Sequence, residues 1–186
     1  MPRPTLASVH PLLRFALIAT GLYLLWFFGY ERYLAPDGHL DDALTHNIAA
    51  VAAGTLRIMG FDASVSAADL NLILMAGVPT VSIYKACNGM VLYALFAGFV
   101  LAFPSSSIHK VWFIPLGVVL IYGVNVLRIV ALCLNHRYYS QSVDFNHHYT
   151  FTFIEYGFIC LLWVWWAIRL AEPAAPAPNM SPDAHA

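Results

Sequence analysis

The chain has 186 residues, of which 60% are hydrophobic and 10% are charged, and its formal net charge is −1. Soluble domains usually carry about 25% charged residues, so this composition predicts an integral membrane protein and excludes an ordinary soluble domain. The near-neutral charge gives no indication of nucleic acid as a partner. Cys87, Cys133 and Cys160 include no closely spaced pair, which argues against a zinc site or a disulfide framework. We therefore expect no metal and no cofactor.

Four apolar segments are candidates for membrane-spanning helices. They cover residues 12–30, 89–103 with its flanks, 111–134 and 149–170, against the roughly 20 residues that a bilayer requires. The first contains no small-residue cleavage site, which favours an uncleaved helix over a signal peptide. The stretch 43–60 is rich in alanine but carries polar residues, which predicts an amphipathic helix in the membrane interface, with a fifth span as the alternative.

The pattern changes over residues 62–84, where apolar and polar residues alternate. Asp69, Gly77 and Pro79 interrupt the alternation, which predicts one or two short strands, or a small β-hairpin, outside the bilayer. Residues 172–186 are rich in proline and alanine, which predicts a disordered cytoplasmic tail. The predicted fold class is an all-α polytopic membrane protein with about four or five transmembrane helices, forming a single integral membrane domain over residues 1–171. The β-hairpin and the interfacial helix would precede the helix that begins after Cys87.

Cys87 stands at the start of an apolar segment, in the sequence Ala86-Cys87-Asn88-Gly89. Asn88 and Gly89 are suited to beginning a helix, and the N–H groups of a helix N-terminus stabilise a thiolate. The neighbouring Lys85 adds positive potential. Because the thiolate is the nucleophilic form, Cys87 is a candidate catalytic nucleophile. The alternative is a small buried apolar residue.

Arg128 lies inside another apolar segment, and a cation at that depth is costly enough to indicate a functional site. Asn125 precedes it by three residues, so the two share a helical face. They could donate hydrogen bonds to an oxyanion or orient a substrate carbonyl. The alternative is an arginine that extends to the interface. Glu155, inside the last apolar segment, is a candidate partner for Arg128 or for a histidine.

His147 and His148 precede the last apolar segment. A neutral imidazole could accept the proton of Cys87 during attack and return it to the leaving group. Adjacent residues point in different directions, so only one of the two is expected to act. A metal site of His136, His147 and His148 is a weaker alternative, because their spacing matches no common zinc motif.

The chain's basic residues indicate an orientation in the membrane. Arg3 and Arg14 favour a cytoplasmic N-terminus. If residues 43–60 do not cross, the later segments bring Cys87, Arg128 and the histidine pair to the outer face. If residues 43–60 do cross, all three groups move together to the cytoplasmic face. Either topology leaves the three groups on one side of the bilayer.

These motifs together resemble the exosortase/archaeosortase family of multi-pass membrane cysteine transpeptidases. The likeness rests on Ala86-Cys87-Asn88-Gly89 at the start of a membrane helix, on Asn125-Val126-Leu127-Arg128 late in the next, and on a histidine before the last. It covers about residues 60–170 and is greatest to short bacterial members of the Bacteroidetes type. Larger members of the family have more spans before the cysteine.

The resemblance implies a catalytic triad of Cys87, Arg128 and either His147 or His148. It implies substrates that are exported proteins with a C-terminal sorting signal, made of a short motif, a transmembrane helix and a basic tail. Cleavage would proceed through a thioester at the outer face of the plasma (inner) membrane, and the acceptor would be a glycan, a lipid or water. A purely hydrolytic membrane cysteine protease and a non-enzymatic membrane assembly or scaffold protein are the alternatives.

Overall fold

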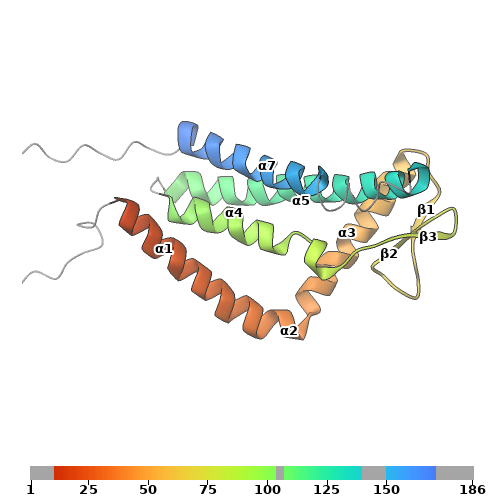
Figure 1. Cartoon of the computed structure of the whole chain (residues 1–186), viewed down its shortest axis with the longest axis horizontal. Coiled ribbons are helices and arrows are strands. Elements are labelled where there is room, and N and C mark those ends of the chain that lie inside the picture. Colours follow the sequence, from red (N-terminus) through yellow and green to blue (C-terminus); the bar gives the residue numbers. More distant parts are fainter. Residues whose placement is uncertain (1–10, 104–106, 140–149, 171–186) are drawn as a thin grey trace, which may run out of the picture.

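The computed structural model describes residues 11–103, 107–139 and 150–170, and most of them are helical (Figure 1). The helices are α1 (Pro11–Trp26), which continues through a π-helical segment (Phe27–Leu34) into α2 (Ala35–Asp37), then α3 (His39–Ile58), α4 (Met90–Ala102), α5 (Ser107–Tyr138) and α7 (Phe151–Trp165), extended by a π-helical segment (Trp166–Leu170). The strands are β1 (Ala63–Val65), β2 (Leu72–Met75) and β3 (Val78–Ser82), and the 3-10 turn Lys85–Cys87 joins β3 to α4.

Three helical segments within the described residues are long and apolar enough to cross a membrane: Leu13–Asp37, Ile108–Tyr138 and Phe151–Arg169. They agree with three of the four predicted spans. The fourth, α4, has 13 residues and a length of about 20 Å, shorter than a hydrocarbon core of about 30 Å. The predicted count of four or five spans is therefore not confirmed. The predicted tail, 172–186, lies outside the described residues.

The helix expected at residues 43–60 is present as α3, which begins earlier, at His39. Asp41 and Asp42 occupy its first turn and Arg57 its last, which complements the helix dipole. Its buried apolar residues follow the helical period and form one stripe: Ile48, Ala49, Ala52, Ala53 and Leu56. The amphipathic pattern is confirmed, but the stripe packs on α5 and the sheet. The apolar face of α3 therefore packs against protein and not against the membrane interface.

The predicted hairpin is a three-stranded antiparallel sheet with strand order β1-β2-β3. Ala76 and Gly77 connect β2 and β3 with φ values of 50° and 74°, as a two-residue type I′ turn requires. Pro79 lies in β3, an edge strand, where its missing N–H costs least. The prediction of one or two strands was wrong, because β1 has only 3 residues and offers too little alternation to be recognised.

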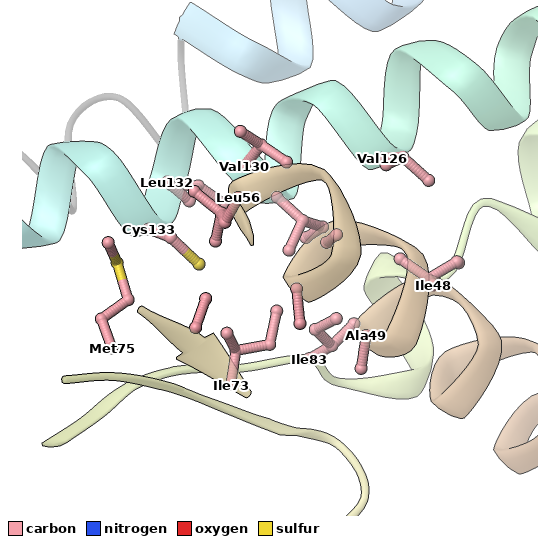
Figure 2. Close-up of a cluster of buried hydrophobic side chains, with 14 residues drawn as sticks. Ile48, Ala49, Leu56, Ile73, Met75, Ile83, Val126, Val130, Leu132 and Cys133 are labelled. Carbon is pink, nitrogen blue, oxygen red and sulfur yellow. The ribbon is translucent and has the colours of Figure 1, made fainter. Parts of the chain in front are cut away.

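Two separate clusters of buried apolar side chains hold these elements together. The first, the bundle cluster, joins α4, α5 and the last helix; its buried members are Leu92, Phe96, Val100, Phe113, Ile121, Ile159, Leu162 and Trp166. The second, the sheet-side cluster, joins α3, the sheet and the last part of α5 (Figure 2). Figure 2 shows Ile73 and Met75 of β2 on one side of α3 and the residues of α5 on the other.

The helix α5 belongs to both clusters because of its length. Its 32 residues extend about 48 Å, which exceeds a hydrocarbon core of about 30 Å by roughly 12 residues. This excess matches the part of α5 from Val126 onward, which packs in the sheet-side cluster. Figure 1 shows α5 running past the ends of α4 and α7 toward the sheet. Asn125 and Arg128 therefore lie where the two clusters meet.

Candidate active site

Cys87 closes a short turn between β3 and α4, which we call the nucleophile turn (residues 84–89). The backbone N–H of Cys87 donates to the carbonyl of Tyr84 at 2.8 Å, and α4 begins at Met90 with Gly89 as its N-cap. The expectation that Asn88 and Gly89 begin the helix is confirmed. Cys87 itself lies in the preceding 3-10 turn and is half-buried.

Gly89 permits this turn for two physical reasons. Its φ is +82°, a left-handed conformation that an L-residue adopts at a cost of about 1–2 kcal/mol. A Cβ at this position would also lie 2.9 Å from Tyr93 Oη and 3.1 Å from Asn125 Nδ2. The side chains of α4 and α5 thus approach the backbone as closely as glycine allows. The turn is held against α5, the helix that carries Arg128.

Arg128 bridges the thiol and a buried carboxylate. Its Nη2 lies 4.0 Å from Cys87 Sγ, at the outer limit of a hydrogen bond to sulfur. Its Nη1 donates to Glu155 Oε2 at 2.9 Å, and the two side chains are 11% and 5% exposed. Of the two partners considered for Glu155, Arg128 is therefore observed. A guanidinium fixed by α7 in this way presents positive charge to the sulfur of Cys87.

Asn125 was expected to donate a hydrogen bond to an oxyanion or a substrate carbonyl, and in the structure it donates to the backbone of the nucleophile turn. Its Nδ2 donates to the backbone carbonyl of Cys87 at 3.2 Å, so this donor already has an acceptor and serves to hold the turn. The side chain is completely buried, and its Oδ1 has no hydrogen-bond partner among the described residues. Asn125 therefore positions Cys87 in this structure.

Asn88 connects the nucleophile turn to two residues that sequence reasoning missed. Its Nδ2 donates to Asp41 Oδ1 at 2.7 Å across 47 positions of sequence, and Tyr30 Oη donates to the same carboxylate at 2.7 Å. Asp41 looked like an ordinary acidic residue in the first turn of a helix. No local pattern links it to Asn88, so only the tertiary structure brings it to the site.

His147 and His148 lie outside the described residues, so their distance from Cys87 stays a prediction. The third member of the metal-site alternative, His136, is exposed near the end of α5. Within residues 11–103, 107–139 and 150–170, no group of three His, Cys, Asp or Glu side chains is arranged to hold a metal ion. The metal alternative gains no support from the described part of the chain.

Comparison with known proteins identifies the family of the chain. The family model for the transmembrane exosortases matches residues 8–166, whereas no curated protein and no solved structure matches the chain. The match begins well before the stretch 60–170 on which the resemblance was recognised, so α1 and α3 belong to the family region too. The three long apolar helices indicate a multi-pass membrane protein. The chain belongs to the transmembrane exosortase family.

Proposed function

We propose that this exosortase cleaves the C-terminal sorting signal of exported proteins through a thioester on Cys87, at the outer face of the plasma membrane. Family membership supports a membrane cysteine transpeptidase in general. The observation that carries the proposal is the approach of Arg128 Nη2 to Cys87 Sγ at 4.0 Å, with Nη1 of the same guanidinium held by Glu155. A thiol beside a fixed cation is suited to acyl transfer.

In the first half of the reaction, the sulfur of Cys87 attacks the scissile carbonyl and the thiol proton passes to His147 or His148. The carbonyl oxygen becomes an oxyanion, which Arg128 stabilises. Collapse of this intermediate breaks the C–N bond, and the histidine returns the proton to the departing amine. The products are a thioester on Cys87 and the released C-terminal segment.

In the second half, an acceptor amine or hydroxyl, or water, attacks the thioester. The histidine removes the acceptor's proton, the C–S bond breaks, and the proton returns to the sulfur of Cys87. Capture by an amine or hydroxyl gives transpeptidation, and capture by water gives simple proteolysis. Added hydroxylamine distinguishes the two half-reactions, because it forms a hydroxamate at the new C-terminus only if a thioester exists.

We propose further that the substrate's transmembrane helix lies in a cleft between α1 and α4. This cleft has a volume of about 330 Å³ and is lined chiefly by apolar side chains, including Leu22, Trp26, Val91 and Phe99. Ala94 and Gly98 of α4 also line it, and small residues let a second helix approach closely within a bilayer. The α4 wall of the cleft begins four residues after Cys87, so a helix seated there would direct its preceding motif toward the thiol.

A variant that fills the cleft tests whether the substrate helix lies there. A Cβ on Gly98 would meet no atom within 4 Å, so Gly98→Phe should fold, occupy the cleft and abolish processing while Cys87 still reacts with maleimide. Gly157→Phe is the matched control, because Gly157 is also unobstructed but lies on α7 outside the cleft. Equal processing by the two variants would contradict this location.

The function is tested by comparing membrane proteins from cells with the wild-type enzyme and with Cys87→Ser. We expect mass spectrometry to find a set of proteins that lose their C-terminal transmembrane segment only with the wild type. Cys160→Ser, which changes an exposed cysteine on α7, should process the same set. If Cys87→Ser is inserted normally and still processes that set, the cysteine mechanism is wrong and a scaffold or another enzyme is favoured.

The histidine role needs separate variants. His147→Ala and His148→Ala should differ, with one of them reducing processing by about 100-fold or more, the usual contribution of a general acid–base group. Full processing by both variants would remove the histidine from the mechanism and leave Cys87 and Arg128.

A further inference from the structure

Asp41 is a buried carboxylate that the mechanism above does not use. It lies in the first turn of α3 and is only 4% exposed. A buried carboxylate is costly unless it accepts hydrogen bonds. Its side chain accepts them from Tyr30 Oη, which lies 2.7 Å from each carboxylate oxygen, and from Asn88 Nδ2 at 2.7 Å. Both donors are neutral side chains, one from the end of the first membrane helix and one from the nucleophile turn.

Asn88 is fixed at both ends by these contacts. While its Nδ2 faces Asp41, its Oδ1 accepts the backbone N–H of Met90 at 2.9 Å and so caps α4. Its backbone carbonyl accepts a hydrogen bond from Tyr93 Oη at 3.3 Å, and the whole residue is 2% exposed. The amide can have only one orientation that satisfies all partners, because its nitrogen must face the carboxylate and its oxygen must face Met90.

Fixing Asn88 fixes Cys87, which directly precedes it. The peptide group between them is also held on the other side, where Asn125 Nδ2 donates to the carbonyl of Cys87. Asp41 and Asn125 thus hold the turn from α3 and from α5. Between these two restraints the sulfur lies 4.0 Å from Arg128 Nη2, and displacement of a reacting group by about 1 Å can cost about 100-fold in rate.

We propose that Asp41 is a positioning residue for the nucleophile: acting through Asn88, it holds the turn so that the sulfur of Cys87 lies beside Arg128. This inference rests on the proposed function in that Cys87 is the nucleophile. Tyr30 completes the site by ordering the carboxylate and by tying the end of the first membrane helix to the same point. A second tie between α3 and the turn, the ion pair of Lys85 and Asp42 at 2.9 Å, is 51% and 41% exposed, and exposed pairs contribute little.

The test exchanges the two partners. Asp41→Asn removes the charge at nearly constant shape, and Asn88→Asp alone places two carboxylates against each other. The double variant Asp41→Asn/Asn88→Asp restores a donor and an acceptor with their positions reversed, and the carboxylate at position 88 still accepts the N–H of Met90. Rescue by the exchanged pair would show that the hydrogen bond itself matters, which a general loss of stability cannot imitate.

The readout is the rate at which N-ethylmaleimide modifies Cys87 in the full-length chain in phospholipid nanodiscs. Peptide mass spectrometry measures the modified fraction of Cys87 over time, with the wild-type chain as the reference. We expect each single variant to react about tenfold more slowly, because the turn no longer holds the sulfur beside the Arg128 guanidinium and small displacements of a reacting group have large effects on rate. The exchanged pair should return to within about twofold of wild type, and the control Asp42→Asn should stay within about twofold throughout.

Two outcomes would overturn the proposal. One is an Asp41→Asn rate within twofold of wild type. The other is an exchanged pair that reacts no faster than the slower single variant. If Asp41→Asn fails to insert, the exchanged pair still decides, since it restores a donor and an acceptor between positions 41 and 88 and leaves one oxygen at position 41 for Tyr30 Oη. Because thiol modification requires no substrate, this result is independent of whether sorting-signal cleavage is the correct function, which the Cys87→Ser comparison decides.

Discussion

The ion pair of Arg128 and Glu155 gives the sharpest prediction about stability. Glu155→Gln replaces a carboxylate that is 5% exposed and accepts from Arg128 Nη1 at 2.9 Å. The glutamine keeps an oxygen that can accept this hydrogen bond but removes the charge that balances the guanidinium. The positive charge then stays largely buried without its carboxylate.

The expected loss of folding stability follows from the burial of the ion pair. Removing one partner of a buried ion pair typically costs about 3–5 kcal/mol, and because glutamine retains the acceptor we expect about 2–3 kcal/mol for Glu155→Gln. At about 2–4 °C per kcal/mol for a chain of this size, the Tm should fall by roughly 5–10 °C. Glu31→Gln is the control: Glu31 is exposed and bonded only weakly, to Trp26 Nε1 at 3.3 Å among the described contacts, so its Tm should hardly change.

The assay is thermal unfolding of the full-length chain in one detergent, with a double-mutant cycle. Arg128→Gln and Glu155→Gln should each be destabilising, and the double variant should lose less than the sum of the two, because removing both partners leaves no unbalanced charge. Additive losses would refute the reasoning, since they would mean that the two groups do not stabilise each other. A Tm for Glu155→Gln equal to that of Glu31→Gln would refute it as well.

Two further predictions concern glycines that the packing requires. Gly89→Ala should lower stability by at least about 1–2 kcal/mol through its left-handed φ alone, and the contact with Tyr93 Oη at 2.9 Å should also slow maleimide modification of Cys87; an unchanged rate would show that the turn tolerates a side chain. Gly117→Ala would make its Cβ overlap with Cζ of the fully buried Phe96 ring and should cost about 1–3 kcal/mol. Gly98→Ala, which meets no atom within 4 Å, should be neutral or stabilising, and thermal unfolding that ranks Gly98→Ala below Gly117→Ala would contradict this packing of α4 on α5.

Sequence reasoning predicted the parts of the site that depend on rare residue types in apolar surroundings. A charged residue inside a membrane-length apolar segment is uncommon, so Arg128 and Glu155 were visible without the structure, and their contact follows once α5 and α7 pack together. Cys87 was visible because polar and small residues follow it just before an apolar run. These features are local, and local features can be recognised from the sequence alone.

The parts that sequence reasoning missed depend on contacts across long stretches of chain. Asp41 and Asn88 are 47 positions apart, and each alone has an ordinary explanation, as a first-turn acid and as a helix cap. The strand β1 was missed because 3 residues carry no usable period. The contact of Asn125 with the Cys87 carbonyl was not predicted, because spacing within α5 cannot specify the position of that carbonyl.

The arrangement of the helices also makes a prediction about topology. In Figure 1 the start of α1 and the end of α7 lie at the end of the bundle opposite the sheet, whereas the start of α4 lies toward the sheet. If these helices cross the bilayer together, Cys87 and the segment that follows α7 must lie on opposite sides of the membrane. This holds whichever way the whole molecule is oriented, because reversing it moves both groups.

Thiol labelling of intact cells tests this arrangement. In a Cys160→Ser background, which removes the exposed cysteine of α7, a reporter is added by Ala175→Cys. A membrane-impermeant methanethiosulfonate should then label Cys87 and spare the reporter, because Arg3 and Arg14 favour a cytoplasmic N-terminus and the start of α1 lies at the same end of the bundle as the end of α7. Labelling of the reporter alone would reverse the orientation but keep the arrangement. Labelling of both would mean that α4 and α7 do not cross together, and the proposed approach of a substrate helix along α4 would fail with it.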